Sequence, residues 1–362
     1  MKIQVSKDDL LSGLQTVQNV VSSKMTLPIL SNILMETKKN SLKLNATDLD
    51  IGISCEIPVE IIEQGGITIP AKRFSDIVRE LPSGQLTIHA QKNNQIFIEG
   101  NQCRFKLNGL PKEEFPKFPE FKDKEVIQFG QKEFKDMLRL TSFAVSHEES
   151  RYVLNGLLLE IDNDILRIVA TDGRRLAKIE KKLPNTIKKD INVIIPIKAI
   201  QEILRNLKDE GMVSFMVGTN QVLFDINGTL IATRIIEGEF PNYHQVIPQP
   251  TNNKVCVNTQ DLLSSIRRAS LLSTQDFQAV KFEVFRDKVV VSKNTPDVGE
   301  SREELLAQYN GSELIIGFNP HLLIDFLKNV EQEQIEMELF GADKSAVMRL
   351  GDYLYLALPM RI

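Results

Sequence analysis

The chain has 362 residues, of which 42% are hydrophobic, 25% charged and 6% aromatic, with no Trp and a formal net charge of −4. This length is too great for one ordinary core and suits two or three domains of about 100–150 residues, while the composition excludes a disordered or fibrous chain. The slightly acidic total argues against a surface coated with cations for wrapping nucleic acid, but it leaves room for a local basic face.

Membrane, secretion and disulfide signals are missing from the sequence. No apolar run approaches the 18 or so residues of a spanning helix, and the first residues lack the apolar centre of a signal peptide, so we expect a cytoplasmic protein without a membrane partner. The three cysteines, Cys55, Cys103 and Cys256, are odd in number and lack a CxxC pair. We therefore expect small buried hydrophobes rather than disulfides or zinc ligands.

The chain repeats itself three times. Ala46-Thr47-Asp48 recurs as Ala170-Thr171-Asp172 and, more faintly, as Asn294-Thr295-Pro296, in steps of 124 residues (170 − 46 and 294 − 170). Glu114-Phe115-Pro116 recurs as Glu239-Phe240-Pro241, and both copies lie in Pro-rich stretches that resist helix and central strand. These stretches are the predicted linkers, and they divide the chain into domains 1–122, 123–252 and 253–362.

The predicted elements follow the same order in each repeat. A one-sided helix comes first, with the apolar positions Leu10, Leu14, Val17 and Val21, then Phe134, Leu138, Thr141 and Val145, then Leu262, Ile266 and Ala269. A second helix carries Phe74, Ile77, Val78 and Leu81, then Ile200, Ile203, Leu204 and Leu207, then Leu323, Phe326, Leu327 and Val330. Alternating strand pairs follow it at 86–88 with 96–98, 213–217 with 222–226, and 335–339 with 347–350. The pattern predicts an α+β fold in which two helices pack on antiparallel sheets in every repeat.

The polar faces of these helices are basic. Five residues after the first apolar anchor of the second helix stand Arg79, Arg205 and Lys328. The corresponding places of the first helix hold Gln15, Arg139 and Arg267, with Lys135 and Arg268 nearby. Two interpretations stay open: an ordinary solvated helix face, or a basic face that attracts nucleic-acid phosphates without regard to sequence.

No constellation for catalysis is present. The four histidines, His89, His147, His244 and His321, lack metal-ligand spacing, and the chain has no phosphate-binding glycine loop or GxSxG motif. We therefore predict no catalytic residue, no metal and no cofactor. Asp48 and Asp50 are the best enzyme candidates, as ligands of a divalent ion in a metal-dependent phosphohydrolase. A strand-end turn, with Asp accepting backbone N–H bonds, is the favoured alternative because the motif lies at a repeated junction.

Short motifs along the whole chain resemble one known family. Ala170 to Ala177 (ATDGRRLA), Arg151 to Gly156 (RYVLNG) and Leu358 to Ile362 (LPMRI) are similar to the bacterial DNA polymerase III beta subunit, the replicative sliding clamp. Thr26 to Leu30 (TLPIL) and Glu239 to Tyr243 (EFPNY) fit the same family in order and spacing.

The resemblance implies a DNA clamp fold. Three clamp-type domains per chain, and two chains joined head to tail, would form a six-domain ring with the helices inside. Twelve helices at a spacing of about 10 Å would leave a hole of roughly 28 Å, enough for duplex DNA. The implied function is a processivity factor that slides on DNA and tethers polymerases, with an unclosed peptide-binding scaffold as the alternative.

The resemblance also implies a pocket for partner peptides between the second and third domains. Its matching positions are Leu154, Thr171, Gly173, Arg174, Arg175, Leu176, Pro241, Val246, Leu358, Pro359, Met360, Arg361 and Ile362. Apolar walls with an adaptable Met suit a Leu or Phe anchor. Gln245 stands where some members have Arg, and Ala357 is small, so the preferred motif is open.

Two further sets of residues follow from the resemblance and the helix faces. The expected subunit interface contains Arg73, Arg104, Phe105 and Leu107 on one edge, and Leu271, Leu272, Glu300, Glu303 and Glu304 on the other. For the four hydrophobes, core packing is the alternative. The expected DNA contacts are Lys24, Arg79, Arg139, Arg151, Tyr152, Arg205, Arg267 and Lys328; Glu148, which repels phosphate, and Val153, which lacks a ring, are left out.

The implied partners are a second copy of the chain, duplex DNA, DNA polymerase III alpha and other polymerases, and repair proteins with clamp-binding motifs. A separate ATP-driven clamp loader is also expected, because the chain has no ATP site of its own. In this interpretation the protein is cytoplasmic and associated with the nucleoid, and the charge of −4 sums a basic helical lining and an acidic exterior.

Overall fold

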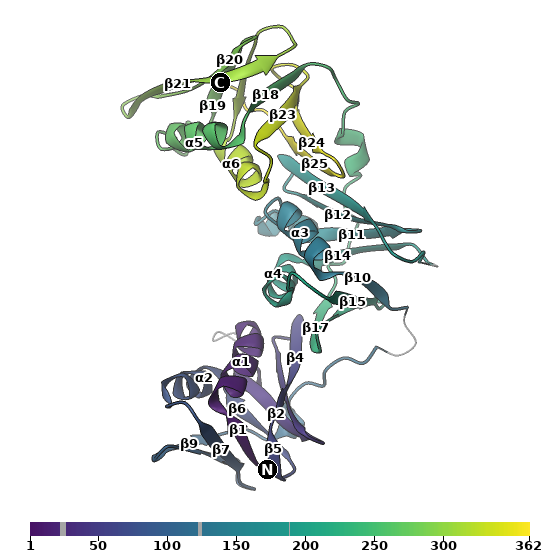
Figure 1. Cartoon of the computed structure of the whole chain (residues 1–362), viewed down its shortest axis with the longest axis vertical. Coiled ribbons are helices and arrows are strands. Elements are labelled where there is room, and N and C mark those ends of the chain that lie inside the picture. The colour runs from purple at the N-terminus through teal and green to yellow at the C-terminus, as the bar shows by residue number, and fades with distance from the viewer. Residues whose placement is uncertain (22–26, 122–124, 188) are drawn as a thin grey trace. The chain divides into compact units, whose positions relative to one another are not determined.

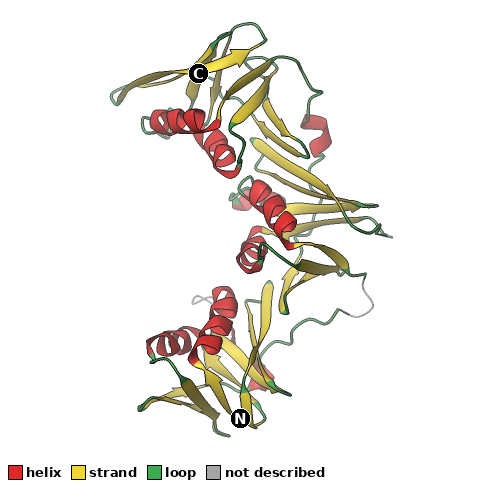
Figure 2. Cartoon of the chain, in the orientation of Figure 1, coloured by secondary structure: helices red, strands yellow, loops and turns green. Residues whose placement is uncertain are grey.

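The computed structural model describes residues 1–21, 27–121, 125–187 and 189–362. The chain divides into two compact units, Met1–Lys135 with Lys198–Ile235, and Asp136–Ile197 with Ile236–Ile362. The boundary between the units therefore runs through the middle repeat. Each unit combines antiparallel sheets with helices (Figures 1 and 2).

The first unit contains two sheets, ordered β5-β1-β7-β8-β9 and β10-β15-β16-β17-β4-β3-β2-β6. Its strands are β1 (Lys2–Ser6), β2 (Asn32–Lys38), β3 (Ser41–Thr47), β4 (Ile51–Pro58), β5 (Glu60–Glu63), β6 (Gly66–Pro70), β7 (Gln85–Ala90), β8 (Gln95–Gly100), β9 (Cys103–Asn108), β10 (Ile127–Gly130), β15 (Met212–Val217), β16 (Gln221–Ile226) and β17 (Thr229–Arg234). The helices α1 (Lys7–Val17) and α2 (Ala71–Glu80) belong to it, with nearly all of α4 (Ile197–Asn206). Its 3-10 turns are η1 (Gln18–Val20), η2 (Pro28–Ser31) and η3 (Lys112–Glu114).

The second unit contains one sheet, ordered β14-β11-β12-β13-β25-β24-β23-β18-β21-β20-β19-β22. Its strands are β11 (Gly156–Asp162), β12 (Ile165–Thr171), β13 (Arg175–Lys182), β14 (Ile191–Pro196), β18 (Lys254–Asn258), β19 (Val280–Val284), β20 (Lys288–Thr295), β21 (Gly299–Tyr309), β22 (Leu314–Phe318), β23 (Gln334–Leu339), β24 (Ala346–Leu350) and β25 (Tyr353–Ala357). The helices α5 (Thr259–Ser270) and α6 (Pro320–Asn329) belong to it, with most of α3 (Gln131–Ser142) and the 3-10 turns η4 (Glu149–Leu154) and η5 (Tyr243–Val246).

The six helices described here are those that the apolar spacing predicts, and side-chain caps start three of them, α1, α5 and α6. Ser6, Asn258 and Asn319 each accept a backbone N–H of the helix that follows, which satisfies donors that have no partner inside the helix. Most residues of the predicted apolar stripes are buried, as for Leu10, Leu14 and Val17 of α1, while Ile77 and Leu204 are half-buried. The first helix is shorter than its pattern suggests, because it ends at Val17 and continues as η1.

The predicted strand pairs form with the expected partners. Ile88 lies opposite Ile98, Val213 opposite Ile226, and Glu338 opposite Val347. The sequence did not reveal that the last strand of one repeat pairs with the preceding repeat: β17 pairs with β4, and β25 with β13. These two junctions have one register, since Ile51↔Thr233 and Arg175↔Ala357 differ by 124 on both sides (175 − 51 and 357 − 233).

The prediction of three buried cysteines is confirmed only for Cys55. Cys103 and Cys256 are half-exposed free thiols. Cys103 opens β9 at the edge of its sheet, and Cys256 lies between Val255 and Val257, whose side chains take the buried face of β18. None of the described helices is long and apolar enough to cross a membrane.

Candidate functional site

The predicted pocket residues from 171 to 175 form one tight turn between β12 and β13. Asp172 Oδ1 accepts the backbone N–H groups of Arg174 at 2.8 Å and Arg175 at 3.0 Å. Thr171 Oγ1 accepts from Gly173 N at 3.0 Å and donates to the Arg175 carbonyl at 2.6 Å. Gly173 has φ +84°, a left-handed conformation that glycine adopts without steric cost. The turn is thus held by its own side chains and keeps its amides satisfied.

The same network recurs 124 residues earlier, between β3 and β4. Asp48 Oδ1 accepts from Asp50 N at 3.0 Å and Ile51 N at 2.8 Å, and Thr47 Oγ1 accepts from Leu49 N at 3.0 Å. Leu49 holds φ +80° where the second copy has Gly173. Asp48 also pairs with the Lys198 ammonium, so its carboxylate is fully used in the fold. The prediction of a strand-end turn is therefore confirmed, and the described residues contain no cluster of three or more metal-ligating side chains.

Arg175 anchors the second turn from within the fold. Its side chain is only 10% exposed and reaches Asp172 Oδ2 at 3.0 Å and Asp325 Oδ2 of α6 at 2.7 Å. Burial lowers the pKa of Arg175, but Tyr355, Asp325 and Asp172 outweigh burial and hold that pKa above its ordinary value. This cation is a structural group of the turn and stays charged at every physiological pH.

An apolar cluster lies next to the turn and contains the predicted Leu154 and Leu176. Sequence reasoning did not assign the other members to the site, although Phe240 belongs to a motif that repeats. They are Leu158, Val169, Ile194, Phe240, Tyr243, Val347, Leu354 and Leu356. Tyr243 donates its hydroxyl to Glu160 Oε2 at 2.6 Å, and burial, followed by Glu160, raises its pKa. The predicted Pro241 and Val246 flank this tyrosine and are exposed.

The carboxyl-terminal tail connects the turn to β22. Leu358 N donates to the Arg174 carbonyl at 2.8 Å, and Met360 N donates to the Gly317 carbonyl at 2.8 Å. A Cβ on Gly317 would lie 2.8 Å from the Met360 carbonyl oxygen, so this close approach requires glycine. Pro359 to Ile362 line a separate cavity of about 350 Å³ with β22. The tail and the turn therefore form one continuous surface, to which Arg361 and the exposed Ile362 belong.

Two residues predicted to contact DNA, Arg151 and Tyr152, make hydrogen bonds within the protein beside this turn. Arg151 Nη1 donates to the Asp172 carbonyl at 2.9 Å and lies 2.6 Å from the place where a Cβ on Gly173 would stand. The Tyr152 hydroxyl donates to the Glu237 carbonyl. Both side chains support the turn and its surroundings in this structure, while about half of Tyr152 stays exposed. Lys24 lies outside the described residues.

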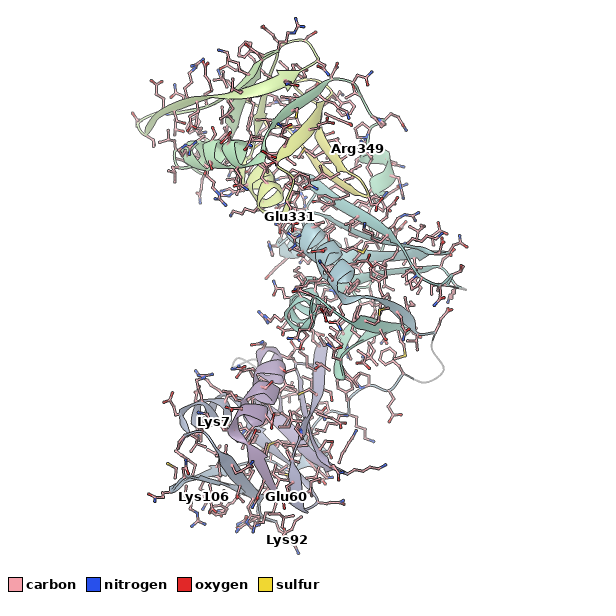
Figure 3. The ribbon with its side chains drawn as sticks, in the orientation of Figure 1. Lys7, Glu60, Lys92, Lys106, Glu331 and Arg349 are labelled. Carbon is pink, nitrogen blue, oxygen red and sulfur yellow. The ribbon has the colours of Figure 1, made fainter. Side chains whose placement is uncertain are left out.

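The basic helix positions differ in how their charge is used. Arg139 donates to the Asn329 carbonyl at the end of α6 at 2.6 Å and lies 3.4 Å from Glu331, which is labelled in Figure 3. Arg79 pairs with Asp76 and Arg205 with Glu202, three residues earlier on the same helix. Arg267 and Lys328 are exposed and have no ion pair in the part of the chain described. The available positive charge is therefore concentrated at fewer positions than the sequence pattern suggests.

The predicted interface residues lie at surface positions of both units. Phe105 on the edge strand β9 is 39% exposed and Leu271 after α5 is 81% exposed, so core packing does not explain either of them. Leu107 and Leu272 are half-buried. Among the charged members, Arg104 pairs with Glu99 at 2.9 Å within its own sheet, and Glu303 pairs with Arg268 at 2.7 Å. Glu304 pairs with Lys288, and Arg73 and Glu300 are exposed.

Three family models match the chain in sequence order. They describe the N-terminal, central and C-terminal domains of the DNA polymerase III beta subunit, and they match residues 1–119, 128–242 and 244–360. The chain belongs to the DNA polymerase III beta subunit family. The predicted domain limits, after residues 122 and 252, stay predictions.

Relatives and solved structures agree with this assignment to the sliding clamps. The beta sliding clamp of Chlamydia pneumoniae is 33% identical over 365 residues, covering 100% of this chain and 99% of the relative, and that of Pseudomonas putida is 32% identical with full coverage of both. A crystal structure of the Bacillus subtilis DNA polymerase sliding clamp superposes with a TM-score of 0.96 at 32% identity, over 100% of this chain and 99% of that one. A sliding clamp from Pseudomonas aeruginosa bound to griselimycin superposes with a TM-score of 0.95 at 30% identity, over the whole of both chains.

Membership in the sliding clamp family decides between the classes that the sequence left open. The chain is a processivity factor of the replicative DNA polymerase and a non-catalytic subunit, so the phosphohydrolase interpretation of Asp48 and Asp50 is wrong. The expected clamp fold, with three clamp domains and antiparallel sheets, is confirmed.

Proposed function

We propose that two copies of this chain close head to tail into a ring around duplex DNA. The ring then slides because its phosphate contacts are weak and blind to sequence, and it stays bound because it is closed. The observation that supports closure is the exposure of Phe105 in one unit and Leu271 in the other. A contact between two different surfaces joins copies head to tail, and it closes into a ring when the rotation between the copies fits.

Sedimentation tests closure. A dimer at micromolar concentration supports the ring, and Leu271→Asp should convert it to a monomer, because a buried unpaired carboxylate costs several kcal/mol. Lys328→Asp is the matched control, since Lys328 is exposed in the same unit and lies outside the proposed interface. A wild-type monomer at this concentration would instead favour an unclosed peptide-binding scaffold.

We propose further that the turn 171–175, the tail 358–362 and the exposed Pro241 and Val246 form the docking surface for partner peptides. Polymerases, including DNA polymerase III alpha, the clamp loader and repair proteins would place a short apolar motif there. The support is the hydrogen bond from Leu358 N to the Arg174 carbonyl, which joins the tail to the turn beside the apolar cluster. Sliding clamps from Pseudomonas aeruginosa and Bartonella birtlesii have been solved bound to griselimycin, so clamps of this family take a ligand.

Removal of Met360 to Ile362 tests the docking surface. The shortened chain should bind a clamp-binding peptide of DNA polymerase III alpha at least tenfold more weakly and should keep its dimer in sedimentation. Loss of the dimer with unchanged peptide binding would refute the assignment.

We also propose that the DNA contacts include Arg267 and Lys328, whose charges are unpaired in the described part of the chain. We propose further that the protein works in the cytoplasm on the nucleoid.

A further inference from the structure

A second cavity lies beside the first turn, within the first unit. It measures about 180 Å³ and is bordered by β3, β4 and β17 and by the linker from Phe115 to Pro119. An engineered apolar cavity of about 150 Å³ holds a benzene molecule, so this cavity has room for one aromatic or aliphatic side chain. Its position is equivalent to the cluster beside the second turn, because both junctions share one register and one set of turn hydrogen bonds.

Asn45 gives this cavity an unpartnered polar group. The residue is only 5% exposed, and its Oδ1 accepts no hydrogen bond within the described residues. The equivalent position 124 residues later is Val169, which is fully buried in the apolar cluster. A buried acceptor without a donor calls for an explanation, and Asn45 lines the cavity, where a ligand N–H would satisfy it.

Glycine makes the room at this junction. Gly52 stands where the second junction has Leu176, so the first junction lacks one large side chain. A Cβ on Gly52 would lie 3.3 Å from the ring of Phe118, which forms the opposite wall. The cavity therefore exists because Gly52 replaces a large side chain at one of two otherwise matched turns.

The rim of the cavity carries more positive than negative charge. Arg234, which replaces the apolar Leu358 of the second junction, and Lys117 are exposed and have no ion pair within the described ranges. Asp50 is the one unpaired carboxylate among the lining residues that the structure describes. Two cations against one anion favour a ligand with carboxylates at its ends and an apolar centre.

We propose that this cavity is a second docking site, which takes a short acidic peptide of a partner protein. One aromatic or aliphatic side chain fills the cavity, a peptide N–H donates to Asn45 Oδ1, and flanking carboxylates lie against Arg234 and Lys117. The site goes beyond the docking surface at residues 171–175 and 358–362 and does not depend on it, because the two lie in different units of the chain.

Binding of a fluorinated probe to the full-length protein tests the proposal. The probe is the blocked tripeptide acetyl-Glu-(4-fluoro-Phe)-Glu-amide, followed by its ¹⁹F line width. Gly52→Leu and Arg234→Leu, which copy the second junction, should each weaken binding at least tenfold. Lys92→Leu, which removes an exposed cation from the same unit outside the cavity, should leave binding within twofold. Arg234 is exposed, so its variant keeps the test valid even if Gly52→Leu fails to fold.

Three further results separate this site from its alternatives. Asn45→Val should weaken binding of the probe at least fivefold, and unchanged binding would overturn the hydrogen bond to Asn45 on which the proposal rests. The neutral probe with Gln in both Glu positions should bind at least fivefold more weakly, and equal binding would refute the charge argument. Removal of Met360 to Ile362 should leave probe binding unchanged, and its loss would place the probe at the second turn and overturn the proposal.

Discussion

Asp172 is the side chain on which the second turn depends, and its replacement by Ala has a calculable cost. The change leaves the backbone N–H groups of Arg174 and Arg175 without their acceptor, and it removes one of two carboxylates that pair with the Arg175 guanidinium. A hydrogen bond to a charged acceptor contributes about 1.5–3 kcal/mol. Water replaces the acceptor at exposed Arg174 but not at Arg175, which is 9% exposed. The expected loss is therefore about 2–4 kcal/mol.

The repeat supplies a matched control, Asp48→Ala. Asp48 accepts the equivalent two backbone N–H groups and pairs with Lys198, so its loss should lower stability by a similar amount. Calorimetry should show a melting temperature about 5–10 °C lower for each variant. Only Asp172→Ala should also weaken binding of the polymerase peptide, at least tenfold. The reason is that only this turn contains the Arg174 carbonyl, which accepts the hydrogen bond from Leu358 N of the tail.

Two results would refute this reasoning. A melting temperature within 1 °C of wild type for Asp172→Ala would mean that the turn does not rely on its aspartate. Equal loss of peptide binding in both variants would mean that general destabilisation, rather than the second turn, explains the effect. Asp172→Asn keeps an acceptor oxygen and should recover most of the peptide affinity.

Three other predictions follow from single contacts. Gly173→Ala should lower the unfolding free energy by about 1–2 kcal/mol in denaturant titration, because φ is +84° there, and an unchanged midpoint would contradict the strain. Arg139→Ala should lower the unfolding free energy by about 1–2 kcal/mol, because it removes the hydrogen bond to the Asn329 carbonyl at the end of α6. Arg267→Ala should leave the unfolding free energy unchanged and should reduce the slope of log affinity for DNA against log salt concentration by about one. The reverse pattern would refute both assignments. Burial, with Glu56, raises the pKa of Cys55 to about 12, so its thiolate fraction at pH 8 is about 10⁻⁴. Cys55 should therefore react with a disulfide reagent at least about 100-fold more slowly than the half-exposed Cys256. Similar rates for the two thiols would show that Cys55 is accessible.

Local elements of the fold were predictable because one face of each is buried. The spacing of Phe74, Val78 and Leu81 predicts a helix whatever surrounds it, and the structure confirms it. Strand pairing across the repeats was not predictable in this way. Thr229 to Arg234 has the pattern of any half-buried strand. Nothing in its sequence shows that it pairs with β4 of the preceding repeat in addition to β16 of its own.

The candidate site was predictable in part, through motifs rather than through charges. Thr171 to Arg175 is a repeated turn with a mechanism visible in its sequence, and the structure brings these residues together. The basic helix positions do not share one role in the structure. The sequence shows that Arg139 and Arg267 are basic, but it does not show that Arg139 donates a hydrogen bond to the Asn329 carbonyl. The sequence also did not predict that Asn45 Oδ1 lacks a hydrogen-bond donor, because the surroundings of Asn45 include a linker that is distant in sequence.

Retention on DNA tests the central claim, that this clamp acts by encircling the duplex, most directly. The protein is loaded onto a nicked circular plasmid by a clamp loader with ATP, separated from free protein by gel filtration, and then treated with an enzyme that cuts the plasmid once. A closed ring should stay with the circle and leave within minutes of linearisation, while blocking both ends with bound protein should restore retention. Equal retention on circular and linear DNA would contradict the account.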